Sequence, residues 1–216
     1  MYKFNSQKLL LLFFVILIFN NISAQSVDIG IRAGVNLSSN SFEPELESIT
    51  TKNESGLIGG LYFTFNFGIF SLQSEVLYSQ KGSKLESNTS LFNLNRQISL
   101  SYLEFPLLIK YNIPTSKNSQ INIFTGPSFG INLNSKYTID EIDSSYEKNI
   151  KDETKATEVG WIFGLGFNLT FNKVTISIDC RYNYGFTKSA YLNDLFSEVY
   201  NGSFTISAGF SHRINL

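Results

Sequence analysis

The chain has 216 residues with a formal net charge of −1, and 16% of them are charged while 15% are aromatic. This length suits one domain, and the charge balance argues against nucleic acid as a partner, which requires clustered Lys and Arg. The single cysteine, Cys180, excludes an intrachain disulfide, and the low charge favours an outer surface facing something less polar than water.

The chain begins with a positively charged stretch followed by an apolar run. Lys3 and Lys8 precede 11 apolar residues, 9–19, and a polar stretch leads to Ala24. This order is typical of a secretory signal peptide, and the run is too short for the ~20 residues of a spanning helix. The sequence therefore predicts a signal peptide over residues 1–24 and one exported domain over residues 25–216.

After Gln25, apolar and polar residues alternate with period two. The clearest run is Val174 to Phe186, where every charged residue falls on one face; a strand separates the faces in this way, whereas a helix would spread the charges. The eight segments with this pattern are 27–37, 56–68, 70–81, 97–112, 120–134, 158–171, 174–187 and 200–214. Their length and even number predict an all-β fold, an eight-stranded antiparallel up-and-down transmembrane β-barrel.

The connections between these segments alternate in length. Short ones lie around Gly68, over residues 114–118 and at Asn172-Lys173, whereas long polar stretches cover residues 38–55, 82–96, 135–157 and 188–199. Outer-membrane barrels have short turns on the periplasmic rim and long loops outside the cell. We therefore expect both termini in the periplasm and the long loops outside.

Alternation alone does not reveal which face points outward, because a soluble lipocalin-like barrel would bury its apolar face. Aromatic residues gather near the segment ends, as in the two interfacial belts of membrane barrels. These residues are Phe67, Phe70, Tyr111 and Phe171 at one rim, and Tyr78, Trp161, Tyr184 and Tyr200 at the other. The pattern favours an apolar face toward lipid.

The polar face is rich in glycine and carries five acidic and five basic residues. They are Asp28, Glu75, Glu104, Glu158 and Asp179, with Arg32, Lys81, Lys110, Arg181 and Arg213. Buried charges are tolerated when they are paired, so this balance predicts a structural, salt-bridged lumen lining. With Tyr62, Tyr102 and Phe124 on the same face, the side chains would fill an eight-stranded interior.

Short motifs spread over the predicted exported domain resemble those of the PorT-like outer-membrane β-barrel proteins. The matching stretches are Gly30-Ile-Arg-Ala-Gly-Val-Asn36, Glu75-Val-Leu-Tyr-Ser-Gln-Lys-Gly82, Tyr102-Leu-Glu-Phe-Pro-Leu107, Gly126-Pro127, Gly164-Leu-Gly166, and Arg181-Tyr182 with Gly185. The resemblance implies an outer-membrane barrel. Most members of that family have no assigned activity, and the named one supports protein secretion through the type IX system.

Residues suited to catalysis or metal binding are few and poorly placed. His212 and Cys180 fall on the apolar face by parity, so neither has a partner for nucleophilic catalysis. Glu75 and Glu104, on adjacent segments, could act as acid and base, although nearby basic residues make a structural network the better interpretation. The acidic residues of loop 135–157 lack the order of a calcium loop, so a solvated loop is expected. Within it, Tyr137-Thr-Ile-Asp140 and Ser145-Tyr146 could extend the flanking strands beyond the membrane and expose an edge for a partner.

These observations predict a non-enzymatic outer-membrane protein, a monomer surrounded by lipid, without cofactor, metal or nucleic acid. Its lumen would be plugged, and loops 38–55 and 135–157 would contact envelope or secretion proteins. A narrow channel or small-solute transporter is the alternative. A soluble periplasmic ligand-binding barrel and an outer-membrane enzyme remain as further alternatives.

Overall fold

The computed structural model describes residues 24–43, 49–87, 95–140, 145–151, 154–188 and 198–216. The predicted signal peptide, residues 1–24, lies outside these ranges except for Ala24. No helix in these ranges has the length and hydropathy needed to cross a membrane.

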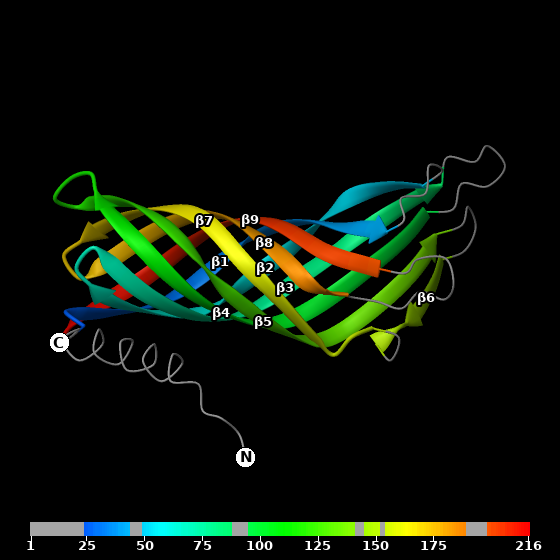
Figure 1. Ribbon diagram of the computed structural model, residues 1–216, viewed down its shortest axis with the longest axis horizontal. Coiled ribbons are helices and arrows are strands. Elements are labelled where there is room, and N and C mark those ends of the chain that lie inside the picture. The colour runs from blue at the N-terminus through cyan, green and yellow to red at the C-terminus, as the bar shows by residue number, and fades with distance from the viewer. Residues whose placement is uncertain (1–23, 44–48, 88–94, 141–144, 152–153, 189–197) are drawn as a thin grey trace, which may run out of the picture.

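The described chain is built from antiparallel strands that close on themselves. The strands are β1 (Ser26–Glu43), β2 (Ile49–Phe67), β3 (Phe70–Ser87), β4 (Asn95–Pro114), β5 (Ser119–Asp140), β6 (Ser145–Asn149), β7 (Thr157–Phe171), β8 (Val174–Lys188) and β9 (Glu198–Asn215). Their order is β4-β3-β2-β1-β9-β8-β7-β5-β6, and a β4–β5 pairing completes a ring of eight strands (Figure 1). The predicted eight-stranded antiparallel barrel is confirmed, with β6 as a short addition on β5.

Short turns join the strands at one end of the barrel. Gly68 and Asn172 have positive φ values, 73° and 56°, which a glycine or an asparagine adopts with little strain. The described termini lie at the same end, because Gln25 N donates to Asn66 O at 2.8 Å and Leu216 N donates to Gln25 O at 3.2 Å. Figure 1 shows the C-terminus at this end, opposite β6.

At the opposite end, the strands extend beyond the predicted segments. The described parts of the polar stretches 38–55, 82–96 and 135–157, expected to be loops, are mostly strand: β1 runs to Glu43, β3 to Ser87 and β5 to Asp140. This expectation was wrong because residues such as 38–41, Ser-Ser-Asn-Ser, are polar on both faces, so alternation disappears while backbone pairing continues. Within 135–157, β5 continues to Asp140 and pairs with β6, so that Lys136 lies opposite Asn149; this confirms the expected extension of the flanking strands.

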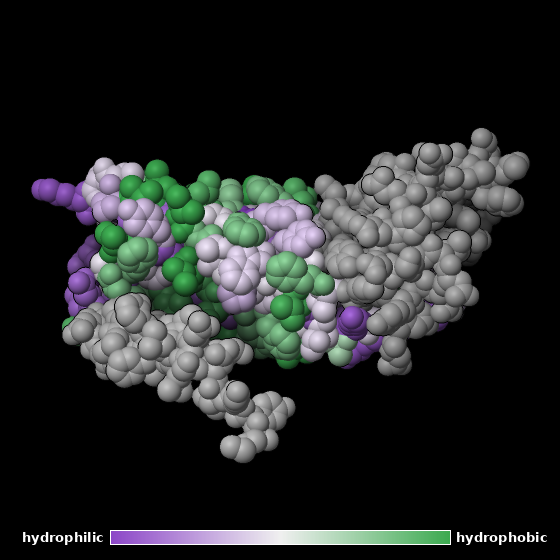
Figure 2. Space-filling view, in the orientation of Figure 1, coloured by the Kyte–Doolittle hydropathy of each residue, from purple (hydrophilic) through white to green (hydrophobic). Residues whose placement is uncertain are grey.

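The barrel has its apolar side chains outside and its polar side chains inside. Ile31, Leu57 and Leu165 are 60%, 63% and 58% exposed, while charged residues face the interior. Figure 2 shows apolar residues over the middle of the visible face. This is the reverse of the lipocalin-like arrangement and suits lipid as the surrounding solvent.

Aromatic side chains lie near both limits of the outward apolar band. Tyr78, Trp161 and Tyr184 are exposed toward the β6 end, and Phe70, Tyr111 and Phe171 are exposed at the turn end. Phe67 is half-buried, and the side chain of Tyr200 lies outside the described residues. Rings at these two levels match the headgroup depth at which aromatic residues concentrate.

Candidate functional site in the barrel lumen

The ten charged residues expected inside the barrel, called here the lumen network, come from six of the strands. Nine of these side chains are buried and Arg213 is half-buried. Each lies at an inward position because side chains alternate across the barrel wall. The structure divides them into three groups along the barrel, and Lys110 stands apart from all three ion-paired groups.

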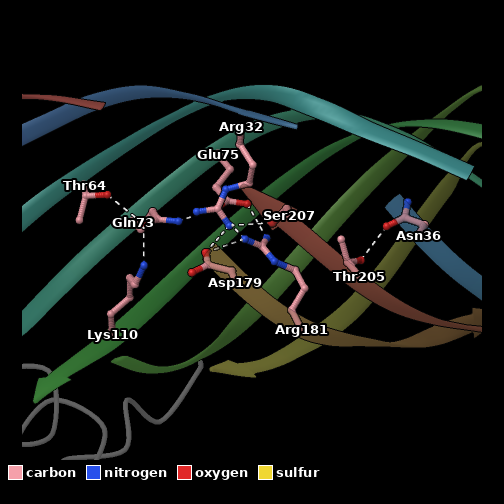
Figure 3. A network of polar contacts seen from close by, with 10 residues as sticks. All are labelled: Arg32, Asn36, Thr64, Gln73, Glu75, Lys110, Asp179, Arg181, Thr205 and Ser207. Carbon is pink, nitrogen blue, oxygen red and sulfur yellow. Dashed lines mark hydrogen bonds and ion pairs between the residues drawn. The ribbon is translucent and has the colours of Figure 1, made fainter. Parts of the chain in front are cut away.

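The central group is formed by Arg32, Glu75, Asp179 and Arg181 (Figure 3). Arg181 donates to both carboxylate oxygens of Glu75, at 2.7 and 3.2 Å, and lies 3.4 Å from Asp179 Oδ2. Arg32 forms an ion pair with Asp179 and lies 3.7 Å from Glu75. Since β3 and β8 occupy opposite positions in the ring, the Glu75–Arg181 pair spans the lumen.

Gln73 connects this group to Lys110. Its Oε1 accepts from Lys110 Nζ at 3.1 Å and from Thr64 Oγ1 at 2.9 Å, while its Nε2 donates to Glu75. Figure 3 shows Lys110 and Glu75 on different sides of this amide. Gln73 therefore separates the ammonium group from the nearest carboxylate of the central group.

A second group lies nearer the β6 end of the barrel. Lys81 Nζ lies 2.7 Å from Glu104 Oε1 and 2.8 Å from Glu158 Oε1, and 5.3 Å from the ring centroid of Tyr102. Glu104 is thus neutralised by Lys81 and not by the basic residues expected near Glu75. Glu75 and Glu104 therefore belong to different groups, and the acid–base pairing considered for them has no support in this geometry.

The third group lies at the turn end of the barrel. Arg213 donates to both oxygens of Asp28, at 2.7 and 2.8 Å, and the two residues are direct partners in the β1–β9 pairing. Asn66 Nδ2 adds a 3.1 Å hydrogen bond to Asp28. Two parallel charge-assisted bonds fix the guanidinium and carboxylate planes relative to each other.

Large aromatic rings fill the lumen where glycines leave room for them. A Cβ on Gly164 would lie 2.3 Å from two ring atoms of Phe124, and one on Gly30 would lie 2.6 Å from Tyr62. The guanidinium groups of Arg181 and Arg32 lie 5.5 and 5.0 Å from these ring centroids. Such cation–π contacts partly replace the hydration that burial removes.

The lumen also contains an apolar cluster, of which the sequence predicted only Phe124 to point inward. Leu108, Phe124 and Ile162 pack together at 2% exposure or less, and Leu77 is fully buried as well. Strand parity places Leu77 with Glu75 and Leu108 with Lys110, so the signal was present. Leu77, Leu108 and Ile162 were not predicted because only charged, aromatic and glycine residues were assigned to the inward face.

Two cavities lie on either side of the central group. The one at the turn end is lined by residues such as Arg32, Gln73 and Lys110 and has free space for about one water molecule. The other is larger and lies beside Lys81 between β2, β3 and β4. The ion pairs, Phe124 and the apolar cluster occupy the lumen between them.

The residues considered for catalysis or metal binding lie elsewhere. His212 and Cys180 are exposed on the outer face, where His212 pairs with Ile29 and Val174. In loop 135–157, Glu141, Asp143, Asp152 and Glu153 lie outside the described residues. Within the described ranges, no group of three or more potential metal-binding side chains occurs.

Comparison with known proteins gives one family and several solved structures. The family model described as outer membrane protein beta-barrel domain matches residues 23–191. No curated protein matches the sequence. Among solved structures, the outer membrane protein OprG from Pseudomonas aeruginosa is similar with a TM-score of 0.57 and 15% identity, covering 89% of this chain and 97% of OprG.

Two other solved structures show weaker likeness. Ail, the attachment invasion locus protein of Yersinia pestis, in complex with the heparin analogue sucrose octasulfate, has a TM-score of 0.40 and 14% identity, covering 87% of this chain and 99% of Ail. Neisserial surface protein A has a TM-score of 0.44 and 12% identity, covering 87% of this chain and 97% of its own. The likeness to OprG extends to the fold alone.

Proposed function

The chain belongs to the outer membrane protein beta-barrel domain family, and from this premise we propose that it is a non-enzymatic barrel with a plugged lumen. Its activity would lie at the end formed by the extended strands and long loops, as an interaction surface or secretion accessory. The observation that carries the proposal is the Glu75–Arg181 ion pair, which spans the lumen from β3 to β8.

The central group of ion pairs, together with the side chains packed beside it, forms the proposed plug of the lumen. Removing one member of a buried ion pair leaves an uncompensated charge and typically costs about 3–5 kcal/mol. Glu75 and Arg181 are 2% and 3% exposed, so opening the lumen by separating them would incur a cost of this order. Leu77 and Leu108, both fully buried, fill space beside the pair.

Conductance recordings in planar bilayers test the plug. The purified wild-type protein should insert without a steady ion conductance, whereas the double variant Glu75→Ala/Arg181→Ala should conduct because both sides of the central contact are removed. The variant also serves as the control for insertion. A steady conductance of the wild-type protein would overturn the proposal and favour the alternative below.

The alternative is a narrow channel or small-solute transporter. It is favoured by the two cavities, one at the turn end and one beside Lys81. Rearrangement of Arg181 between Glu75 and Asp179, which it already contacts, would be the opening step. In that case the wild-type barrel would conduct, and substitution of Arg181 would change the conductance.

The interaction surface is supported by the length of the strands. A transmembrane β-strand needs about 9–11 residues, whereas β4 and β5 contain 20 and 22. The additional residues project beyond the apolar band, and β6 leaves one of its edges without a partner strand in the described residues. An unpaired edge is a template for another strand.

The resemblance to PorT-like proteins adds envelope or secretion proteins as the proposed partners, bound through residues 38–55 and 135–157. Deleting each segment in turn and recovering partners from detergent extracts tests this role. A matched control deletes residues within the 188–199 segment. If partner recovery is the same for all three deletions, the surface proposal fails while the plug is unaffected.

The proposed protein is a monomer in outer-membrane lipid with its termini in the periplasm and residues 1–24 removed on export. Intact mass of the protein purified from outer membranes tests the cleavage, which predicts a chain beginning at Gln25. A mass corresponding to the full chain would contradict it.

The non-enzymatic assignment is supported by the positions of the reactive groups. His212 lies on the outward apolar face, and Glu75 and Glu104 are each engaged by basic side chains. General acid–base chemistry requires a group within reach of a substrate proton. Hydrolase assays with the purified barrel should give the same background rate for the wild-type protein and for Glu75→Gln.

A further inference from the structure

The cavity at the turn end is a vestibule that reaches the mouth of the barrel. Its lining includes Asn66, Ser71 and Asn112, which lie within a few residues of the turns, and Arg32 and Lys110 at its inner end. The free space inside it is about that of one water molecule, so it suits a single small ion.

Lys110 is the unusual member of this lining. Its side chain is buried at 3% exposure, and it is the one cation of the lumen network with no carboxylate within 4.0 Å in the described residues. Its contacts are the Gln73 amide oxygen at 3.1 Å and the Phe124 ring at 5.2 Å. A buried ammonium group requires compensation that these neutral contacts supply only in part.

The remaining charges near the inner end of the vestibule do not provide that compensation. Arg32, Arg181 and Lys110 face Glu75 and Asp179, so three cations stand against two carboxylates in this layer. Asp28, the only carboxylate in the lining, is held in two hydrogen bonds by Arg213. The layer therefore lacks one negative charge.

Hydrogen-bond donors without partners point to the same place. Arg32 Nη2 and Nε are buried and have no hydrogen-bond partner, and Arg32 lines the vestibule together with Lys110. Ser177, also in the lining, has a buried hydroxyl without a partner. Donors of this kind, combined with an excess positive charge, are suited to an anion.

We infer that the vestibule binds a small monovalent anion, of the class of chloride or a short carboxylate such as formate, beside Lys110. The anion enters from the end that carries the short turns and accepts hydrogen bonds from the ammonium group. This inference is independent of the proposed plug, because Lys110 lines the vestibule whether or not the lumen beyond it conducts.

Chloride-35 NMR line widths of the purified barrel in an uncharged maltoside detergent test the inference, with sodium chloride as the probe. The wild-type protein should broaden the chloride resonance, and Lys110→Met should lose that broadening. Lys117→Met, which removes an exposed lysine in a turn at the same end, should keep it. Equal broadening by the wild-type protein and Lys110→Met would overturn the inference.

A second measurement needs no variant. Crystals of the wild-type protein grown with sodium bromide should show an anomalous bromide peak within hydrogen-bond distance of Lys110 Nζ. A vestibule without such a peak would overturn the inference even if Lys110→Met failed to fold. Formate added at equal ionic strength should reduce the peak, whereas gluconate, which is much larger than the one-water-sized free space of the vestibule, should not.

Discussion

Charged and aromatic side chains can be buried inside the barrel because each one matches its neighbours in charge or in size. Glu75 faces two guanidinium groups, and Phe124 lies over Gly164. Strand parity in the sequence predicts that these residues point inward. It does not predict that Lys81 reaches Glu158, 77 residues away, because such pairing depends on the stagger of the strands around the ring.

Removing the charge of Glu75 should destabilise the barrel. Glu75→Gln leaves Arg32 and Arg181 with Asp179 as their shared carboxylate, so the free energy of unfolding should fall by about 3–5 kcal/mol. Urea unfolding in lipid or detergent measures this loss. Glu147→Gln is the matched control, because its pair with Lys136 is exposed and should be worth about 0–1 kcal/mol. Equal effects would refute the structural role of the central group.

Gly164 should be intolerant of a larger side chain. A Cβ there would lie 2.3 Å from Phe124 and 2.8 Å from the Cys180 carbonyl oxygen. Gly164→Ala should therefore cost about 1–3 kcal/mol through overpacking. Part of the loss should be recovered in the Phe124→Leu background, which removes the ring. Strictly additive effects in this double-mutant cycle would show that the ring is not the obstacle.

At the level of strands, the boundary between the apolar band and its polar extension sets the depth of the barrel in the membrane. On β7 the outward residues from Val159 to Phe171 are apolar, whereas β1 carries Ser38-Ser39-Asn40-Ser41 beyond Leu37. The sequence locates the band well, since alternation is strong within it. It underestimates the length of the strands, because backbone hydrogen bonding continues beyond the residues at which apolar and polar side chains alternate.

Charge on the lipid-facing side should be tolerated according to depth. Leu165 lies midway along the apolar part of β7 and is 58% exposed, so Leu165→Arg should cost about 2–4 kcal/mol. Leu37→Arg, at the outer limit of the band, should cost about 0–1 kcal/mol. Folding titrations in liposomes measure both values. A reversed order would place the bilayer differently on the barrel.

At the level of the whole molecule, the ring of strands assigns the short turns and the extended strands to opposite ends. Closure of eight strands follows from the even count of alternating segments, and that part of the fold was predictable. The β5–β6 hairpin was anticipated only as an extension, because its register rests on backbone pairing rather than on an apolar pattern.

The orientation in the membrane can be measured on whole cells. In a Cys180→Ser background, a cysteine introduced by Glu147→Cys on β6 should react with a membrane-impermeant maleimide, whereas one introduced by Asn118→Cys in a short turn should react only after lysis. Both positions are exposed in the folded protein. The opposite labelling pattern would place the termini outside the cell.

The pairing of β1 with β9 has a consequence for how the protein reaches its folded state. These strands are joined from Ser26–Asn215 to Glu43–Glu198, and the Asp28–Arg213 contact links residues 185 positions apart. Strand β1 can therefore pair with β9 only after the whole chain is available, and contacts between residues so far apart in sequence slow folding. A chain lacking residues 198–216 should fail to form the heat-resistant, fast-migrating species of a folded barrel on electrophoresis. Before β1 and β9 pair, the edge of each strand is unpaired and open to aggregation. We therefore expect the unfolded chain to need a holding chaperone while it crosses the periplasm.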